Sequence, residues 1–204
     1  MAIESWDQRL AHILVKPLVA TPVHPNHLTG LSFVFGLAAA LLFARGDAGW
    51  ANLAAGLFMV AVFLDHTDGE LARQAGKTSD FGHRFDSVVN ASNYTMMFIG
   101  VGIGLSGGPL GDWAVTLGLA AGLSNPFILL MRIRTENRHG AKAVAHPRYA
   151  GVEIEDLIYL IGPITWLGGL EYFFVAYGIG SFGYFAWTVW QTLKPRPRQT
   201  APAR

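Results

Sequence analysis

The chain has 204 residues, of which 51% are hydrophobic and 14% charged, and its formal net charge is +1. So few charged side chains cannot cover the surface of a soluble protein this apolar, and the near-neutral charge gives no indication of a nucleic-acid partner. The absence of cysteine excludes disulfides and thiolate metal sites.

Residues 1–24 are expected to form a juxtamembrane amphipathic segment. Four apolar residues recur there at helical spacing, with charged residues between them: Trp6, Leu10, Ile13 and Leu14. The charges exclude the apolar core of a cleaved signal peptide. We expect a short helix on the membrane surface that is broken by Pro17 and Pro22, with a frayed terminus as the alternative.

Six uncharged, mostly apolar runs follow. They are residues 28–44, 48–64, 87–111, 113–131, 157–170 and 172–193. A helix needs about 20 apolar residues, and at least roughly 17, to cross a bilayer. Five runs reach that length, and the run from Leu157 reaches it only if Ile154 and its neighbours extend the helix. The expected fold class is an all-α membrane protein, with a six-transmembrane-helix bundle over residues 25–193 and a disordered cytoplasmic tail over 194–204.

The basic residues indicate how the bundle is oriented. Fourteen of the 15 Lys and Arg residues lie in alternate connections: two before the first run, three between the second and third, five between the fourth and fifth, and four in the tail. Only Arg45 lies on the other side. By the positive-inside rule, both termini are cytoplasmic. We therefore expect a multi-pass protein of the cell membrane.

Small residues mark two of the runs. Gly100 and Gly104 stand four apart in the third, and Gly178, Gly180 and Gly183 cluster in the sixth. Glycine lets helix backbones approach closely, so these faces are expected to pack against neighbouring helices or a second subunit, as in a homodimer. The alternative is the general tolerance of membrane helices for glycine.

Acidic residues gather where the second run ends and the third begins. If the second helix continues, Asp65 and Asp68 share one face, and Asp86 and Asn90 share a face of the next helix. Clustered carboxylates repel one another unless cations neutralise them, and hard oxygen ligands favour Mg²⁺, Mn²⁺ or Ca²⁺. Two such ions could clamp a pyrophosphate. For the Asp-x-x-Asp-Gly segment alone, a solvated polar loop is the better interpretation.

The larger pattern is more specific. It reads D-x-x-D-G-x-x-A-R-x₈-G-x-x-x-D from Asp65 to Asp86 and resembles the signature of the CDP-alcohol phosphotransferases. Pro25-Asn26-x-x-Thr29, just upstream, is similar to another segment of that family.

This resemblance implies six transmembrane helices, a cytoplasmic active site and two divalent cations, Mg²⁺ or Mn²⁺ with Ca²⁺ as a substitute. It implies transfer of a phosphatidyl or similar group from a CDP-linked lipid, such as CDP-diacylglycerol, to a small or lipid alcohol, with release of CMP. The implied metal ligands are Asp65, Asp68, Asp86 and the residue at position 90. The implied nucleotide site comprises Asn26, Thr29, Asp65, Asp68, Gly69, Ala72, Arg73 and Gly82.

One position departs from the family. Its fourth aspartate, a metal ligand and the expected general base, is replaced by Asn90, whose amide can coordinate metal but cannot accept a proton. The replacement leaves three alternatives: an inactivated variant, an enzyme with a different base, or a catalytically impaired homologue that still binds CDP-lipid and metal. The distant acids Glu153, Glu155 and Asp156 are better explained as helix N-terminal acids. His66 and His83 are better explained as solvated loop histidines.

Three arginines follow the fourth run. Arg132, Arg134 and Arg138 could bind the phosphate of an acceptor such as glycerol phosphate or inositol phosphate. The positive-inside rule alone also accounts for them. The acceptor alcohol is therefore left open by the sequence.

Overall fold

A computed structural model describes residues 6–139, 148–149 and 152–193 of the chain. Nearly all of them are helical, apart from two antiparallel strands of two residues each. The elements are α1 (Trp6–Val19), α2 (Pro25–Phe43), α3 (Ala48–Gln74), α4 (Asp80–Leu105), α5 (Asp112–His139), β1 (Arg148–Tyr149), β2 (Val152–Glu153), the 3₁₀-helix η2 (Ile154–Leu160), α6 (Ile161–Trp166) and α7 (Leu170–Leu193). The expected tail at 194–204 lies outside the described residues.

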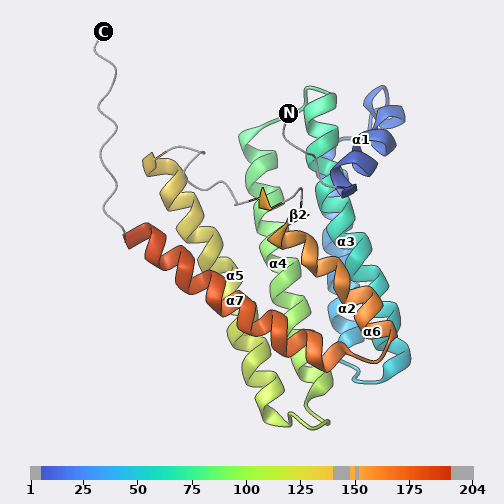
Figure 1. Ribbon diagram of the computed structural model, residues 1–204. Helices are drawn as coiled ribbons and strands as arrows, with labels where there is room; N and C mark the ends of the chain where they lie inside the picture. Colours follow the sequence, from blue (N-terminus) through green and yellow to red (C-terminus); the bar gives the residue numbers. More distant parts are fainter. Residues whose placement is uncertain (1–5, 140–147, 150–151, 194–204) are drawn as a thin grey trace.

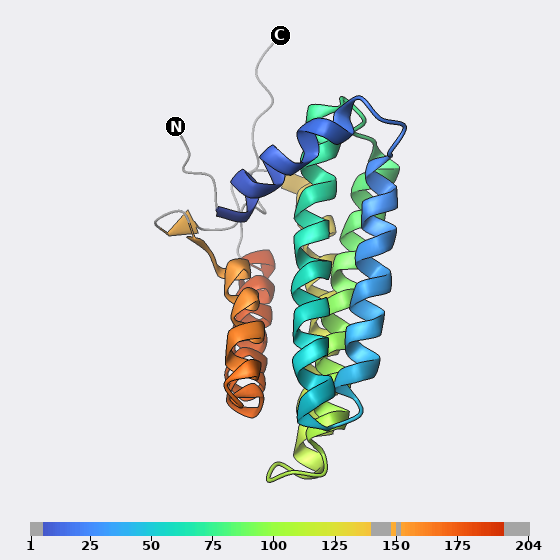
Figure 2. The same ribbon diagram turned by 90° about the vertical axis from the view of Figure 1, so that its right-hand side faces the viewer.

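The long helices form a bundle in which α2, α3 and α4 run side by side (Figures 1 and 2). Helix α5 packs on α4, α7 packs on α5, and α6 lies against α3. Helix α1 lies across the end of α3 (Figure 2). The core holds large side chains contributed by α2, α3, α4 and α7, among them Phe43, Phe58, Phe98 and Phe174.

Helices α2 to α5 are each long and apolar enough to cross a bilayer. The chain is therefore a multi-pass membrane protein. Helix α7 has 24 residues but is not among the candidate spans of the described residues. The segment from η2 through α6 rises roughly 23 Å, less than the apolar thickness of a bilayer. The count of six spans stays a prediction.

Helix α1 confirms that the N-terminal segment is helical and corrects one boundary, while its place on the membrane surface stays a prediction. Pro17 does not end the helix, which runs two residues further to Val19. A proline in the last turn removes only one of the final hydrogen bonds, so the turn tolerates it. Ala11 and Val15 are buried, whereas Ile13 and Leu14 are exposed on the side expected to meet the membrane surface.

Glycines bring the backbones of α2 and α4 together. A Cβ added at Gly100 would collide with the carbonyl oxygen of Ala40, and one at Gly104 with that of Phe43. Close packing at these two glycines is thus confirmed within one chain. In α7, an added Cβ would meet nothing within 4 Å at Gly183. The homodimer stays a prediction.

These contacts predict opposite effects of two matched substitutions. Gly100→Ala should destabilise the protein by about 1–3 kcal/mol, because the backbones of α2 and α4 must separate. Gly183→Ala should leave stability unchanged or slightly raised, because alanine favours a helix and has room there. Thermal unfolding of both variants in detergent measures the difference, and equal melting temperatures would contradict the packing described.

Candidate functional site

The acidic motif lies on helices and not in a loop. Helix α3 continues to Gln74, so Asp65 and Asp68 do share one helical face, as predicted. Helix α4 begins at Asp80, earlier than the apolar run, because the Ser79 side chain caps it by accepting a hydrogen bond of 3.0 Å from the backbone N–H of Gly82. Asp86 and Asn90 then lie on successive turns of α4.

Asp68 is buried and held by α2. Its side chain is 3% exposed, and its Oδ2 accepts a short hydrogen bond from the hydroxyl of Thr29, itself 2% exposed. A buried carboxylate needs such a donor, because an unpaired charge in an apolar interior is costly. The resemblance placed Thr29 beside the motif, and the structure brings the two together.

Asp65 links α3 to α4. Its Oδ2 accepts a hydrogen bond of 2.7 Å from the Asn90 side-chain amide. Its Oδ1 is buried and has no hydrogen-bond partner among the described residues. The carboxylate also lies close enough to Asp68 and Asp86 to be repelled by both. An unpartnered acidic oxygen beside two further acids has the chemistry of a site for a hard cation.

The described side chains do not yet form a complete cage. No three His, Asp or Glu side chains in the described ranges surround a single point at ligand distance. The contacts already described give a reason, since Thr29 holds one oxygen of Asp68 and Asn90 one oxygen of Asp65. The donor atoms thus fit a divalent cation, but some side chains must rotate to hold it.

The remaining motif residues surround this cluster. Gly82 lies beside Asn26, since a Cβ on the glycine would stand 3.3 Å from the asparagine Oδ1. Gly69 and Ala72 lie on α3, and a Cβ at Gly69 would stand 3.5 Å from the guanidinium of Arg73. That guanidinium pairs with Glu70 at 2.7 Å.

Glu70 joins the motif helix to α1. Its Oε1 lies 2.8 Å from the His12 ring and accepts a hydrogen bond of 2.8 Å from Gln74. Gln74 also donates to the backbone carbonyl of His12 at 3.0 Å. The N-terminal helix is therefore fastened directly to the acidic motif.

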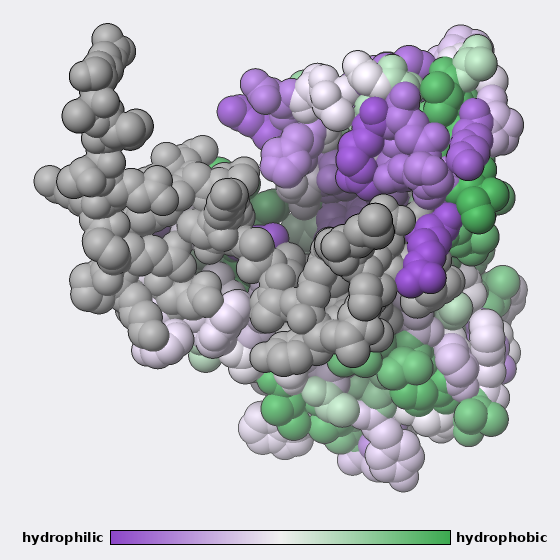
Figure 3. Space-filling model, turned by 45° about the horizontal axis from the view of Figure 1, so that its top comes forward, coloured by the Kyte–Doolittle hydropathy of each residue, from purple (hydrophilic) through white to green (hydrophobic). Residues whose placement is uncertain are grey.

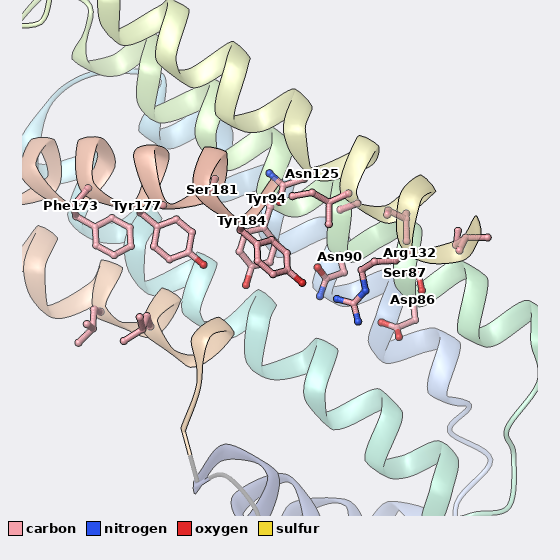
Figure 4. A pocket seen from close by; sticks show the side chains of 18 of the residues that line it. Asp86, Ser87, Asn90, Tyr94, Asn125, Arg132, Phe173, Tyr177, Ser181 and Tyr184 are labelled. Atoms are coloured by element: carbon pink, nitrogen blue, oxygen red, sulfur yellow. The ribbon is translucent and has the colours of Figure 1, made fainter. Parts of the chain in front are cut away.

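A cavity of about 830 Å³ opens beside the cluster, between α4, α5, the η2–α6 segment and α7. Asp86 and Asn90 line one end, and Arg132 extends into the same region (Figure 4). Phe173 and Tyr177 line the far end, so the cavity runs from a polar end to an aromatic end (Figure 4).

The three predicted arginines do not share one place. Arg132 lines the cavity, whereas Arg134 is exposed and does not line it. The side chain of Arg138 lies outside the described residues, as do those of Glu153, Glu155 and Asp156.

The polar end of the molecule coincides with the motif. Hydrophilic side chains gather over the end that carries α1 and the α3–α4 connection, and hydrophobic side chains cover much of the rest of the visible face (Figure 3). The acids therefore lie near the boundary of the apolar bundle. The cytoplasmic orientation of this end stays a prediction.

Sequence reasoning missed a second polar layer below the acids. The Asn93 amide donates a hydrogen bond of 3.0 Å to Ser32, whose hydroxyl donates to the carbonyl of Ala61 at 2.8 Å. The Asn93 carbonyl oxygen is buried without a hydrogen-bond partner among the described residues and lies against Gly36. A polar residue within an apolar run, three positions after Asn90, was the available signal.

The chain resembles known proteins in sequence and in fold. The family model described as CDP-alcohol phosphatidyltransferase matches residues 22–191. An archaetidylinositol phosphate synthase of Pyrococcus horikoshii is 33% identical over 90 residues, which are 44% of this chain and 46% of that protein. A phosphatidylinositol phosphate synthase of Streptomyces avermitilis is 35% identical over 92 residues, 45% of this chain and 36% of that protein. The matched stretches thus span less than half of these relatives.

A solved structure extends the likeness of fold across the chain. The phosphatidylinositol phosphate synthase of Mycobacterium tuberculosis, solved with CDP-DAG bound, superposes with a TM-score of 0.62 at 19% identity. The superposition covers 93% of this chain and 99% of that structure. At this identity the likeness supports the fold alone.

The hydrogen bond between Thr29 and Asp68 predicts a stability effect. Thr29→Val keeps the side-chain shape but removes the donor, so it should destabilise the protein by about 1.5–3 kcal/mol. Thr29→Ser keeps the hydroxyl and should cost less. Thermal melting of the two variants in detergent compares them, and a valine variant as stable as the serine variant would contradict the role of this bond.

Proposed function

Because the chain belongs to the CDP-alcohol phosphatidyltransferase family, we propose that it transfers a phosphatidyl-type group from a CDP-linked lipid to a phosphorylated polyol, releasing CMP. The observation that carries the proposal is the acidic cluster of Asp65, Asp68 and Asp86 beside a cavity with Arg132 at its polar end. The three aspartates suit metal ions that bind a pyrophosphate, and the Arg132 guanidinium beside them suits the phosphate of an acceptor.

The three aspartates, with the amide oxygen of Asn90, are the proposed ligands of two Mg²⁺ or Mn²⁺ ions, with Ca²⁺ as a substitute. The unpartnered Oδ1 of Asp65 supports this assignment. When bound, the ions would neutralise the pyrophosphate and stabilise the charge of the leaving CMP. The protein contributes the fixed spacing of the acids on α3 and α4.

The nucleotide is proposed to lie along α3 and the start of α4. Asn26 and Gly82 already lie together, and the glycine gives a phosphate or ribose room to approach the backbone. Gly69, Ala72 and Arg73 would border the nucleotide on α3. Thr29 would act indirectly by orienting the Asp68 carboxylate. The donor's acyl chains would remain in the bilayer.

Inositol phosphate is the proposed acceptor. Both curated relatives carry an inositol phosphate product in their names. Arg132 supports the proposal because its guanidinium reaches the cavity end that holds Asp86 and Asn90 (Figure 4). Binding the acceptor's phosphate there would point its free hydroxyl towards the acids, so that catalysis rests mainly on positioning and charge neutralisation.

The active site is proposed to face the cytoplasm, from which both a soluble acceptor and the CDP-lipid head group would reach it. The distribution of basic residues supports this orientation. A homodimer is also proposed, on the exposed apolar faces of the bundle helices.

Asn90 supports a second candidate function, that of an impaired homologue that binds CDP-lipid and metal without turnover. The Asn90 amide nitrogen donates a hydrogen bond to Asp65. An amide cannot accept a proton from a substrate hydroxyl near neutral pH. CMP release separates the two candidates. Turnover by the unaltered chain supports the transferase, whereas binding without turnover, restored by Asn90→Asp, supports the impaired homologue.

The transferase proposal predicts cation-dependent release of CMP from CDP-diacylglycerol and inositol phosphate. Asp68→Asn should lower this rate by at least about 100-fold, because several kcal/mol of charge stabilisation depend on the cations. Asp80→Asn, an exposed acid at the start of α4, should leave the rate unchanged. Full activity in EDTA, or in the Asp68→Asn variant, would exclude this mechanism.

The acceptor proposal predicts a specific change in KM. Arg132→Gln should raise the KM for inositol phosphate about 10-fold or more, since hydrogen bonds to charged groups contribute roughly 1.5–3 kcal/mol. The KM for CDP-diacylglycerol should not change. Arg134→Gln is the matched control, because Arg134 is exposed and does not line the cavity. Equal KM values for inositol phosphate in the two variants would show that Arg132 does not bind the acceptor phosphate.

A further inference from the structure

An acceptor hydroxyl must lose its proton when it attacks phosphorus. The group that receives the proton has to lie within hydrogen-bond reach of the hydroxyl. That group must therefore lie at the polar end of the cavity, where the proposed acceptor would lie beside Asp86, Asn90 and Arg132. This inference rests on the proposed function.

Most polar groups at that end cannot receive a proton near neutral pH. The Asn90 amide is not a base, and the Arg132 guanidinium is always protonated. The Ser87 hydroxyl donates to the carbonyl of His83 at 2.8 Å. The tyrosines that line the cavity carry phenol groups, which are weak acids as a class and poor bases.

Asp86 is the only carboxylate among the described residues that line the cavity, and it already has another role. Its carboxylate lies close enough to that of Asp65 for the two to repel each other. In the proposed mechanism it also binds a cation, whose positive charge makes its oxygens weaker proton acceptors. Asp86 therefore serves poorly as the proton acceptor.

His83 remains. Its imidazole lines the same cavity, one turn before Asp86 and two turns before Asn90 on one face of α4. It is exposed, and its side chain makes no hydrogen bond within the described part of the chain. His66 differs, because it lies on α3 and does not line the cavity.

The charged groups around this position are compatible with a base. Asp80 and Asp86 lie on α4 three residues before and three residues after His83, and no ion pair joins either acid to His83 among the described residues. Arg132 faces the cavity from α5, while Arg73 and His66 lie beside Asp86 on its α3 side. Imidazole as a class changes charge near neutral pH, which suits general-base catalysis.

We propose that His83 is the general base of this enzyme and takes the place of a carboxylate at position 90. The acceptor oxygen forms a bond to the phosphorus that carries the lipid. Its proton passes to the imidazole of His83. The bond from that phosphorus to the bridging oxygen of the pyrophosphate breaks, and the electron pair leaves with CMP.

The test is the substitution of His83 in two backgrounds. In the native background, His83→Gln should lower kcat for CMP release from CDP-diacylglycerol and inositol phosphate by about 100-fold or more, with the KM for inositol phosphate unchanged. In an Asn90→Asp background the new carboxylate supplies a base, so the same substitution should cost less than about 5-fold. Arg84→Gln, which is exposed on α4 and does not line the cavity, is the control.

A second measurement keeps the test decisive if the Asn90→Asp protein is inactive. Free imidazole should restore CMP release by His83→Ala, since the shortened side chain leaves room for it, and should not stimulate the unaltered chain. His83→Gln with full kcat, an equal loss in both backgrounds, or the absence of imidazole rescue would overturn the proposal. Absence of CMP release by the unaltered chain would instead overturn the proposed function, whatever the variants do.

Discussion

Mutual repulsion among buried acids is the constraint on which this bundle depends. Asp65 and Asp68 lie on one face of α3, and Asp86 approaches them from α4. The hydrogen bonds that stabilise these acids come from two different helices. Thr29 on α2 donates to Asp68, and Asn90 on α4 donates to Asp65. The three central helices are thereby held in register at the level of the acids. A cluster of this kind is costly to assemble unless charge is to be bound there.

The layer below the acids makes that register rigid. Ser32 and Asn93 connect α2, α3 and α4 through two hydrogen bonds, and the Asn93 side chain fills the space left by Gly36. Further down, Gly100 allows α4 to touch the backbone of α2. Interhelical hydrogen bonds and small-residue contacts are the main means of joining helices in a membrane. The active groups therefore stand on a closely packed three-helix support, while α6 and α7 border a cavity.

The sequence predicted the helical runs, the shared face of Asp65 and Asp68, and the close approach at Gly100, because each follows from a local period or from residue size. It did not predict that Pro17 lies within α1, since tolerance of proline depends on how near the helix end falls. The hydrogen bond between Thr29 and Asp68 was not predicted, because the family resemblance implied only that Thr29 borders the nucleotide site. The contact between Ser32 and Asn93 and the cavity itself depend on how helices meet, which no single period encodes.

The contact between Glu70 and α1 bears on how deep the acidic motif lies in the membrane. Glu70 lies two residues after Asp68 and holds His12, while Gln74 holds the same part of α1 one turn later. If α1 lies at the lipid–water interface, its hydrogen bonds to the motif helix would fix the depth of the acidic motif in the membrane. The acyl chains of a lipid fix the depth of its phosphates in the membrane. The acidic motif and the pyrophosphate of the donor would therefore lie at the same depth. Loss of these contacts with α1 would then change the depth of the acids relative to the lipid head groups, while the helical bundle kept its fold.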